Sequence, residues 1–180
     1  MNEELHNIIT SLRTKIQGLE KRIELLEGHK IKPITVDISS FPNPEVEFIN
    51  WIKSLVLTQD NLSLVFAQGY IQGVSMILCE FIEQDTSCPI KPNTGKKNQF
   101  YVFHNQKWQQ LDNDTFDKAR LIIESKLFKL FKVWKDNNPK YLTDEYCDIY
   151  SKYHHNVMGS KLTKSAILHR VRIALYLAIA

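Results

Sequence analysis

The chain has 180 residues and a mass of 21.0 kDa, with 43% hydrophobic and 24% charged residues and only 6 Gly and 6 Pro. This composition excludes collagen-like, low-complexity and wholly disordered classes and predicts one globular domain with an appendage. The net charge of +3 is uneven: residues 1–90 carry 7 basic and 12 acidic residues (−5), whereas residues 91–180 carry 16 and 8 (+8), which predicts a surface for polyanions in the second half.

The sequence indicates an intracellular protein. We expect no membrane span, because no uninterrupted apolar run reaches the ~18 to 20 residues that a bilayer requires. The acidic, polar start predicts that the protein is not secreted. Cys79, Cys88 and Cys147 form an odd set without short paired spacing, which is typical of reduced thiols.

The first 27 residues carry the repeat of a left-handed coiled coil, with apolar residues at alternating steps of four and three. Isoleucine occupies the a positions and leucine the d positions, a pattern that favours two parallel strands. Lys15 and Arg22 at g positions would meet Glu20 and Glu27 at e positions of the partner. An amphipathic helix packed on its own domain is the alternative. The predicted apolar seam consists of Leu5, Ile9, Leu12, Ile16, Leu19, Ile23 and Leu26.

We therefore predict a coiled-coil dimerisation segment over residues 1–28, a proline-containing linker over 29–44 and a helical body over 45–180. Within the body, residues 45–83 predict a buried helical hairpin whose second helix is capped by Asp60 or Asn61. Gly69 and Gly73 lie four residues apart, which would let a neighbouring helix approach closely. Residues 84–99 are rich in turn formers and predict a loop.

The second half of the body predicts a β-hairpin near residues 100–111, with its turn at Asn105 and Gln106. A helix over about 115–134 follows, with its apolar face opposite a row of lysines. A further helix is expected to begin near Thr143, capped by its hydroxyl, and to end at Gly159. The last helix is basic at first and apolar over 175–180, so we expect its end to be buried in the body or in a partner.

The sequence contains no catalytic or cofactor motif: no nucleophile elbow, no dinucleotide glycine motif and no Walker spacing. The adjacent His154 and His155 lack the spacing of a metal-binding pair. We therefore expect a protein that is not an enzyme, with no cofactor and no metal. The candidate phosphate contacts for a nucleic acid are Lys126, Lys129, Lys132, Lys135, Lys161, Lys164, Arg170 and Arg172.

The stretch from Pro89 onward resembles a C-terminal domain of uncharacterised proteins of nucleocytoplasmic large DNA viruses, of the giant-virus and iridovirus type. The sequence departs from that pattern at Cys88, which precedes the Pro-Ile pair instead of following it. The resemblance implies a viral protein of the host cytoplasm, virus factory or virion, with other viral proteins as partners. The matching positions are Pro89-Ile90, Lys96 and Lys97, Tyr101-Val102-Phe103, Lys107-Trp108, Trp134, Asn138-Pro139 and Met158-Gly159.

Taken together, the patterns predict a mainly α protein in which a parallel coiled coil precedes a helical domain with a small β-hairpin. The leading hypothesis is a non-catalytic assembly or scaffold protein that forms a parallel homodimer. The alternative is a dimeric nucleic-acid-binding protein that contacts phosphates through its lysine-rich second half.

Overall fold

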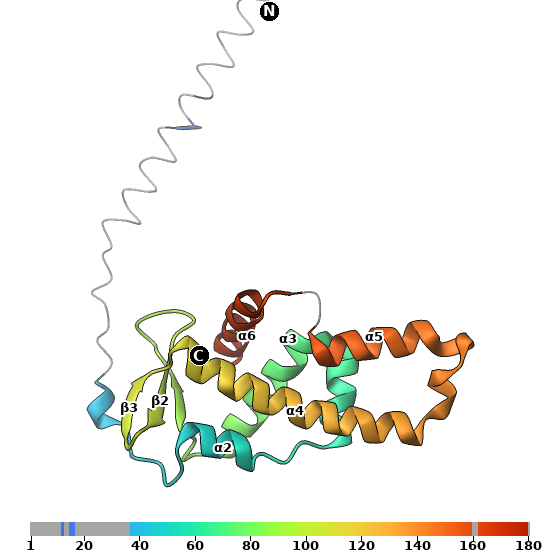
Figure 1. Ribbon diagram of the computed structural model, residues 1–180. Coiled ribbons are helices and arrows are strands. Elements are labelled where there is room, and N and C mark those ends of the chain that lie inside the picture. Colours follow the sequence, from blue (N-terminus) through green and yellow to red (C-terminus); the bar gives the residue numbers. More distant parts are fainter. Residues whose placement is uncertain (1–11, 13–14, 17–36, 160–161, 180) are drawn as a thin grey trace, which may run out of the picture. The chain divides into compact units, whose positions relative to one another are not determined.

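The computed structural model of the protein describes residue 12 and residues 15–16, 37–159 and 162–179, and the chain divides into two units, 1–34 and 35–180. The second unit is mostly helical with one small antiparallel sheet, which confirms the mainly α class. Figure 1 shows the sheet at one end of this unit and the α4–α5 pair at the other. The helices are α2 (Phe48–Ser54), α3 (Gln59–Gln84), α4 (Asn113–Asn137), α5 (Cys147–Met158) and α6 (Lys164–Ile179).

Helix α2 is shorter than predicted, because it begins at Phe48 with Glu47 as its N-cap. It buries Trp51 and Ile52 and packs mainly against α4 and the sheet. The predicted helical hairpin over residues 45–83 is therefore wrong. With only seven residues, α2 is too short to lie along α3 and instead fills the space between α4 and the sheet.

Helix α3 begins with a capping box that the sequence analysis misassigned. Thr58 is the N-cap: its hydroxyl accepts a hydrogen bond from the Asn61 backbone N–H at 3.4 Å. The Asn61 side chain in turn accepts one from the Thr58 backbone N–H at 2.9 Å. The expectation that Asp60 or Asn61 is the N-cap of this helix is thus wrong, because Asn61 occupies the N3 position of the capping box.

A kink divides α3 into two parts. Gly69 has φ 77° and ψ 171°, a backbone conformation that is essentially confined to glycine. Beyond the kink, Gly73 packs on the first part of the same helix, where a Cβ atom would lie 2.8 Å from the Cα atom of Val65. The pair of glycines therefore does allow a close approach, but the approaching segment is the preceding half of α3.

Among the described residues, α3 is the one helix long and apolar enough, by length and composition, to cross a membrane. Half of its most apolar window is buried inside the protein. The kink at Gly69 and the buried side chains on both of its parts identify it as the central helix of the core.

The predicted β-hairpin is confirmed. Strands β2 (Phe100–His104) and β3 (Lys107–Gln110) pair antiparallel, with Phe103 opposite Trp108. Asn105 and Gln106 have φ values of 51° and 58°, as a tight turn of type I′ requires. A third strand, β1 (Ile90–Pro92), pairs with β2 at the edge. The expectation of a loop over 84–99 is therefore wrong at residues 90–92. A strand of three residues that ends in proline is too short and atypical to be predicted from its sequence.

The described end of the predicted linker, residues 37–44, packs against the sheet. It contains a short 3-10 helix, η1 (Ile38–Ser40), and Phe41, whose ring centroid lies 5.2 Å from that of Trp108. The Trp108 indole N–H donates to the Pro42 carbonyl oxygen at 3.2 Å. This segment is therefore part of the folded body, and both faces of the hairpin are covered.

Helix α4 matches its predicted apolar face, with Phe116, Ile123, Leu127 and Phe131 all buried. The next helix begins later than predicted. Two short 3-10 helices, η2 (Pro139–Leu142) and η3 (Asp144–Tyr146), precede α5, and the Thr143 hydroxyl donates to a carbonyl oxygen instead of capping.

Helix α5 ends at Gly159 as predicted, with a left-handed φ of 59°. The apolar end of α6 is divided between the interior and the surface. Leu175 is buried, whereas Leu177 is 78% exposed. The expectation that this end is buried in the body therefore holds for only one side of the helix.

Candidate interaction surfaces

Three residues of the predicted zipper lie in the described part of the chain. Leu12, Lys15 and Ile16 are helical, and Leu12 and Ile16 are 52% and 53% exposed. A helix that carries half-exposed leucine and isoleucine four residues apart presents an apolar face. The other predicted interface residues lie outside the described residues: Leu5, Ile9, Leu19, Glu20, Arg22, Ile23, Leu26 and Glu27.

The candidate phosphate contact Lys126 is used inside the fold. Its ammonium donates to the backbone carbonyl oxygens of Lys53 and Leu55, at 2.6 Å and 2.5 Å, and so caps the C-terminal end of α2. Burial and the neighbouring charge of Lys129 lower the pKa of Lys126. The expectation that Lys126 lies on the solvated side of α4 is wrong, because α2 packs on that side.

Arg172 of α6 has a similar structural role. Its guanidinium donates to the carbonyl oxygens of Leu111 and Asp112 at 3.1 Å and 3.0 Å, where the chain passes from β3 into α4. It also lies over the ring of Phe116, 4.9 Å from the ring centroid. Burial lowers the pKa of Arg172, and this effect is opposed by the charge of Asp112. A side chain held by these three contacts is poorly placed to bind a phosphate.

A polar cluster joins the start of α6 to α4. Lys164, 60% exposed, donates to the nearly buried carboxylate of Asp117 at 2.7 Å, and Arg120 donates to the same carboxylate at 2.9 Å. Arg120 also pairs with Glu124. Burial opposes the charge on Asp117, but the hydrogen bonds from Lys164 and Arg120 outweigh it and lower the pKa of Asp117.

Tyr70 of α3 packs beside this cluster. Its hydroxyl is buried beside the guanidinium of Arg120. Burial, with a further contribution from the charge of Glu124, raises the pKa of Tyr70 to about 12. The tyrosine therefore stays neutral over the physiological range, and the ionic partners in the cluster are the side chains of α4 and α6.

The remaining candidate phosphate contacts that the structure describes lie on two helices, α4 and α6. Lys129 and Lys132 are exposed and Lys135 is half-buried on α4, whereas Arg170 is exposed on α6. Lys161 lies outside the described residues. Of the eight basic side chains that the sequence grouped together, three are therefore engaged within the fold, while Lys129 and Lys132 are exposed one turn apart on α4.

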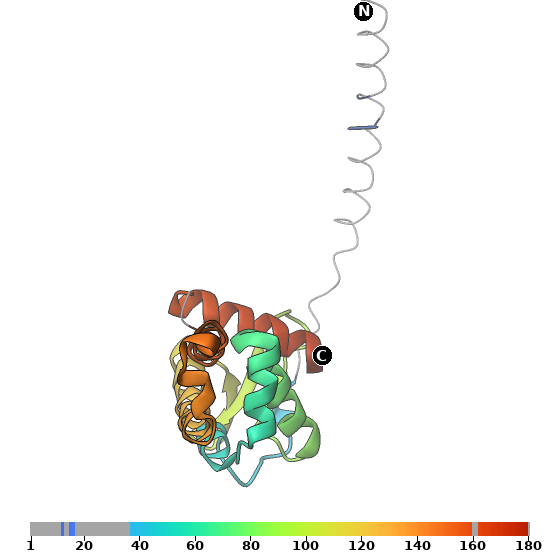
Figure 2. The ribbon, with the colours of Figure 1, turned by 90° about the vertical axis from the view of Figure 1, so that its right-hand side faces the viewer.

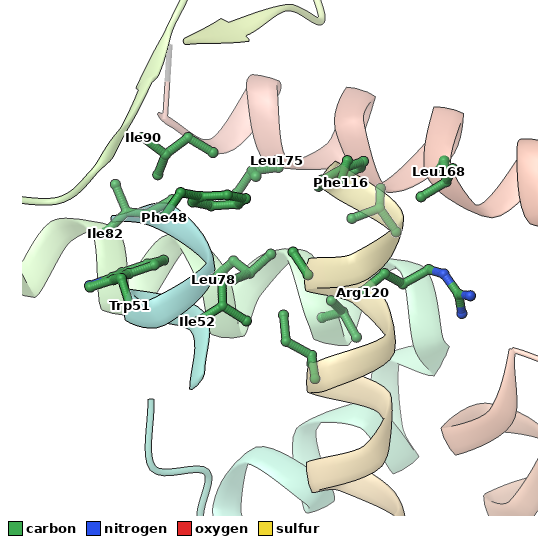
Figure 3. Close-up of a pocket in the computed structure, with 14 residues that line it drawn as sticks. Phe48, Trp51, Ile52, Leu78, Ile82, Ile90, Phe116, Arg120, Leu168 and Leu175 are labelled. Carbon is green, nitrogen blue, oxygen red and sulfur yellow. The ribbon is translucent and has the colours of Figure 1, made fainter. Parts of the chain in front are cut away.

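The enclosed cavity of the body is a packing gap in the core. Its volume is about 10 Å³, which holds at most one water molecule. Figure 3 shows side chains of α2, α3, α4, β1 and α6 converging on it, among them Phe48, Leu78 and Leu175. Arg120 lines it with its aliphatic stem while its guanidinium points away. This cavity is therefore unsuited to a small-molecule ligand.

The cysteines and histidines do not come together as metal ligands. Over residues 37–159 and 162–179, no group of three or more His, Cys, Asp or Glu side chains is arranged to hold a metal ion. Cys88 is buried, and burial raises the pKa of its thiol to about 12. Burial and a hydrogen bond to Glu83 raise the pKa of Cys79 to about 11. Both thiols are therefore protonated at neutral pH.

No known protein family, curated protein or solved structure gives a significant match to this chain. The resemblance of residues 89–159 to a viral domain thus stays a prediction.

Proposed function

We propose that the protein is a non-catalytic assembly protein, in which the segment over residues 5–26 brings two chains together in parallel and each chain carries one helical body. The single observation that carries this proposal is the apolar face that Leu12 and Ile16 present. Leu12 and Ile16 lie on a helix and are about half exposed on one chain, in the d and a positions of the heptad pattern.

The energy of such a seam comes from its apolar layers. Each buried Leu or Ile side chain contributes about 1.5 to 3 kcal/mol before the loss of conformational entropy. The pairs Lys15–Glu20 and Arg22–Glu27 would each add about 0.3 to 1 kcal/mol and mainly select the parallel orientation. The apolar seam therefore provides most of the affinity, and the charged pairs select the parallel orientation of the two helices.

Three of the basic residues considered for nucleic-acid binding make contacts within the body. Lys126, Lys164 and Arg172 hold α2, α4 and α6 in place. Since these are three of the eight residues considered as phosphate contacts, their internal contacts favour the assembly function over nucleic-acid binding.

Sedimentation of the full-length chain tests the proposal. We expect a dimer for the wild-type chain and a strongly weakened dimer for Ile16→Lys, which places a charge in the seam. Gln17→Lys is the matched control, because the heptad pattern puts it on the outer b position. A wild-type chain that remains monomeric at micromolar concentration, or equal effects of the two lysines, would refute the zipper.

Binding to generic duplex DNA separates this function from the alternative. We expect no measurable binding at physiological salt. A tight complex whose affinity falls steeply with salt concentration would support the nucleic-acid function instead.

A further inference from the structure

Helices α3 and α6 form a shallow apolar groove on the surface of the body. The groove has a volume of about 370 Å³ and is lined by Ile71, Gln72, Arg170, Ile173, Ala174 and Leu177. Leu177 is 78% exposed, and Met76, on the neighbouring turns of α3, is 46% exposed. Figure 2 shows α6 side-on along one edge of the body. The apolar end of α6 thus leaves a side that the body does not cover.

The two helices run in the same direction past each other. The Ser75 hydroxyl donates to the Val171 carbonyl oxygen at 3.5 Å, and the Cys79 thiol donates to the Ala178 carbonyl oxygen at 3.8 Å. Arg170 therefore lies level with the turn around Ser75, and Leu177 lies level with the turn around Cys79.

Charges of opposite sign lie at the two ends of this groove. Arg170 is exposed at one end on α6 and has no carboxylate at ion-pairing distance among the described residues. Glu80 and Glu83 are exposed on α3 at the other end, on the helix face that carries Met76, and neither pairs with a described cation. Leu177 lies on α6 beside the acidic end, level with the turn around Cys79.

Two copies of this surface can pair through their opposite charges. In a twofold dimer the axis lies in the plane of the interface, and an axis perpendicular to the line from Arg170 to Glu80 would exchange these two positions between the chains. Arg170 of each chain would then face Glu80 of the other, with Leu177 and Met76 inside the interface. Interfaces between identical chains show this reciprocal pairing.

We propose that the α3–α6 groove is a second self-association surface, on which the body of one chain docks against the body of another chain about a twofold axis. The occupant is a second copy of this chain, because its charge pattern is the one that complements the groove. A coiled coil and a body interface in the same chain would give each molecule two contacts with other copies. Such a chain can link dimers into larger assemblies, which extends the proposed function without depending on it.

The test uses the full-length chain with Ile16→Lys, which removes the zipper and isolates the body interface. We expect this variant to self-associate, by sedimentation, between low micromolar and hundreds of micromolar concentration. Adding Leu177→Gln should raise the dissociation constant by about tenfold or more, because it places a polar group inside the interface. Val56→Gln is the matched control, since Val56 is 77% exposed on another surface, and it should leave the association unchanged.

Charge-reversal variants test whether the groove binds a second copy of this chain. Arg170→Glu alone and the pair Glu80→Lys with Glu83→Lys should each weaken self-association by repulsion, whereas an equimolar mixture of the two should associate again. A monomeric Ile16→Lys variant over the whole range, or a mixture that associates no better than its components, would overturn the proposal. The zipper is judged separately, by comparing wild type with Ile16→Lys, so either interface can fail without the other.

Discussion

The ammonium of Lys126 on α4 lies 2.6 Å from the backbone carbonyl oxygen of Lys53 on α2. It also donates to the carbonyl oxygen of Leu55, so one side chain satisfies two of the acceptors that the end of a helix leaves open. The contact joins elements more than 70 residues apart in the sequence and fixes α2 against α4.

Replacing this ammonium should lower the stability of the fold. We expect Lys126→Met, which keeps the aliphatic stem, to reduce the free energy of unfolding by about 1 to 2 kcal/mol, because hydrogen bonds from a charged donor are lost. Lys129→Met removes an exposed lysine one turn away and should change it by less than about 0.5 kcal/mol. Urea unfolding followed by circular dichroism measures both. Equal effects would contradict the capping role of Lys126.

The sequence located most helices but could not show which of their faces meet. A helical wheel of α4 separates Leu127 and Phe131 from the lysines, and this separation agrees with the buried face. The same wheel places Lys126 in solvent, because nothing in the pattern of one helix reveals that α2 packs beside it. The internal contacts of Arg172 could not be predicted for the same reason, since its carbonyl partners belong to a segment about 60 residues away.

Backbone conformation limited the prediction in another way. The turn at Asn105 and Gln106 was found because two apolar strands flank a polar pair. By contrast, the kink at Gly69 could not be predicted, because the hydrophobic pattern continues through it. One feature of the sequence indicated the groove between α3 and α6, namely the excess of apolar residues over 175–180. Its charged ends could not be predicted, because they depend on how the two helices pack against each other.

The salt bridge between Asp117 and Lys164 predicts a dependence of stability on pH. Asp117 is nearly buried and serves both Lys164 and Arg120, so Asp117→Asn should reduce the free energy of unfolding at pH 7 by about 2 to 3 kcal/mol. The pKa of Asp117 is lower in the folded protein than in the unfolded chain. Its contribution is therefore fully present above the unfolded value and is lost as the pH falls through the folded value.

We accordingly expect the difference in unfolding free energy between wild type and Asp117→Asn to be constant from pH 7 to about pH 5 and to shrink below about pH 4. Chemical unfolding at a series of pH values measures this difference. Asp114→Asn is the control, because Asp114 is an exposed residue of the same helix. A difference that stays constant down to pH 3 would contradict the proposed role of the Asp117 carboxylate.

The close contact between Gly73 and Val65 leads to a prediction about the kink in α3. In Gly73→Ala the new Cβ atom would lie 2.8 Å from the Cα atom and 2.9 Å from the Cγ2 atom of Val65, distances that no relaxed structure tolerates. We expect a loss of about 2 kcal/mol in the free energy of unfolding. Gly69→Ala should also destabilise the fold, but through backbone strain alone, since the nearest atom to its new Cβ is 4.0 Å away.

A double-mutant cycle with Val65→Ala distinguishes the two causes. Removing the Val65 methyl groups relieves one of the two clashes in Gly73→Ala, so Val65→Ala should cost less in that background than in wild type. The clash with the Val65 Cα atom persists, and the double variant therefore stays less stable than Val65→Ala alone. In Gly69→Ala the effects of the two substitutions should simply add, because no new contact with Val65 is formed. Additive behaviour in both backgrounds would mean that the two halves of α3 do not meet at Gly73.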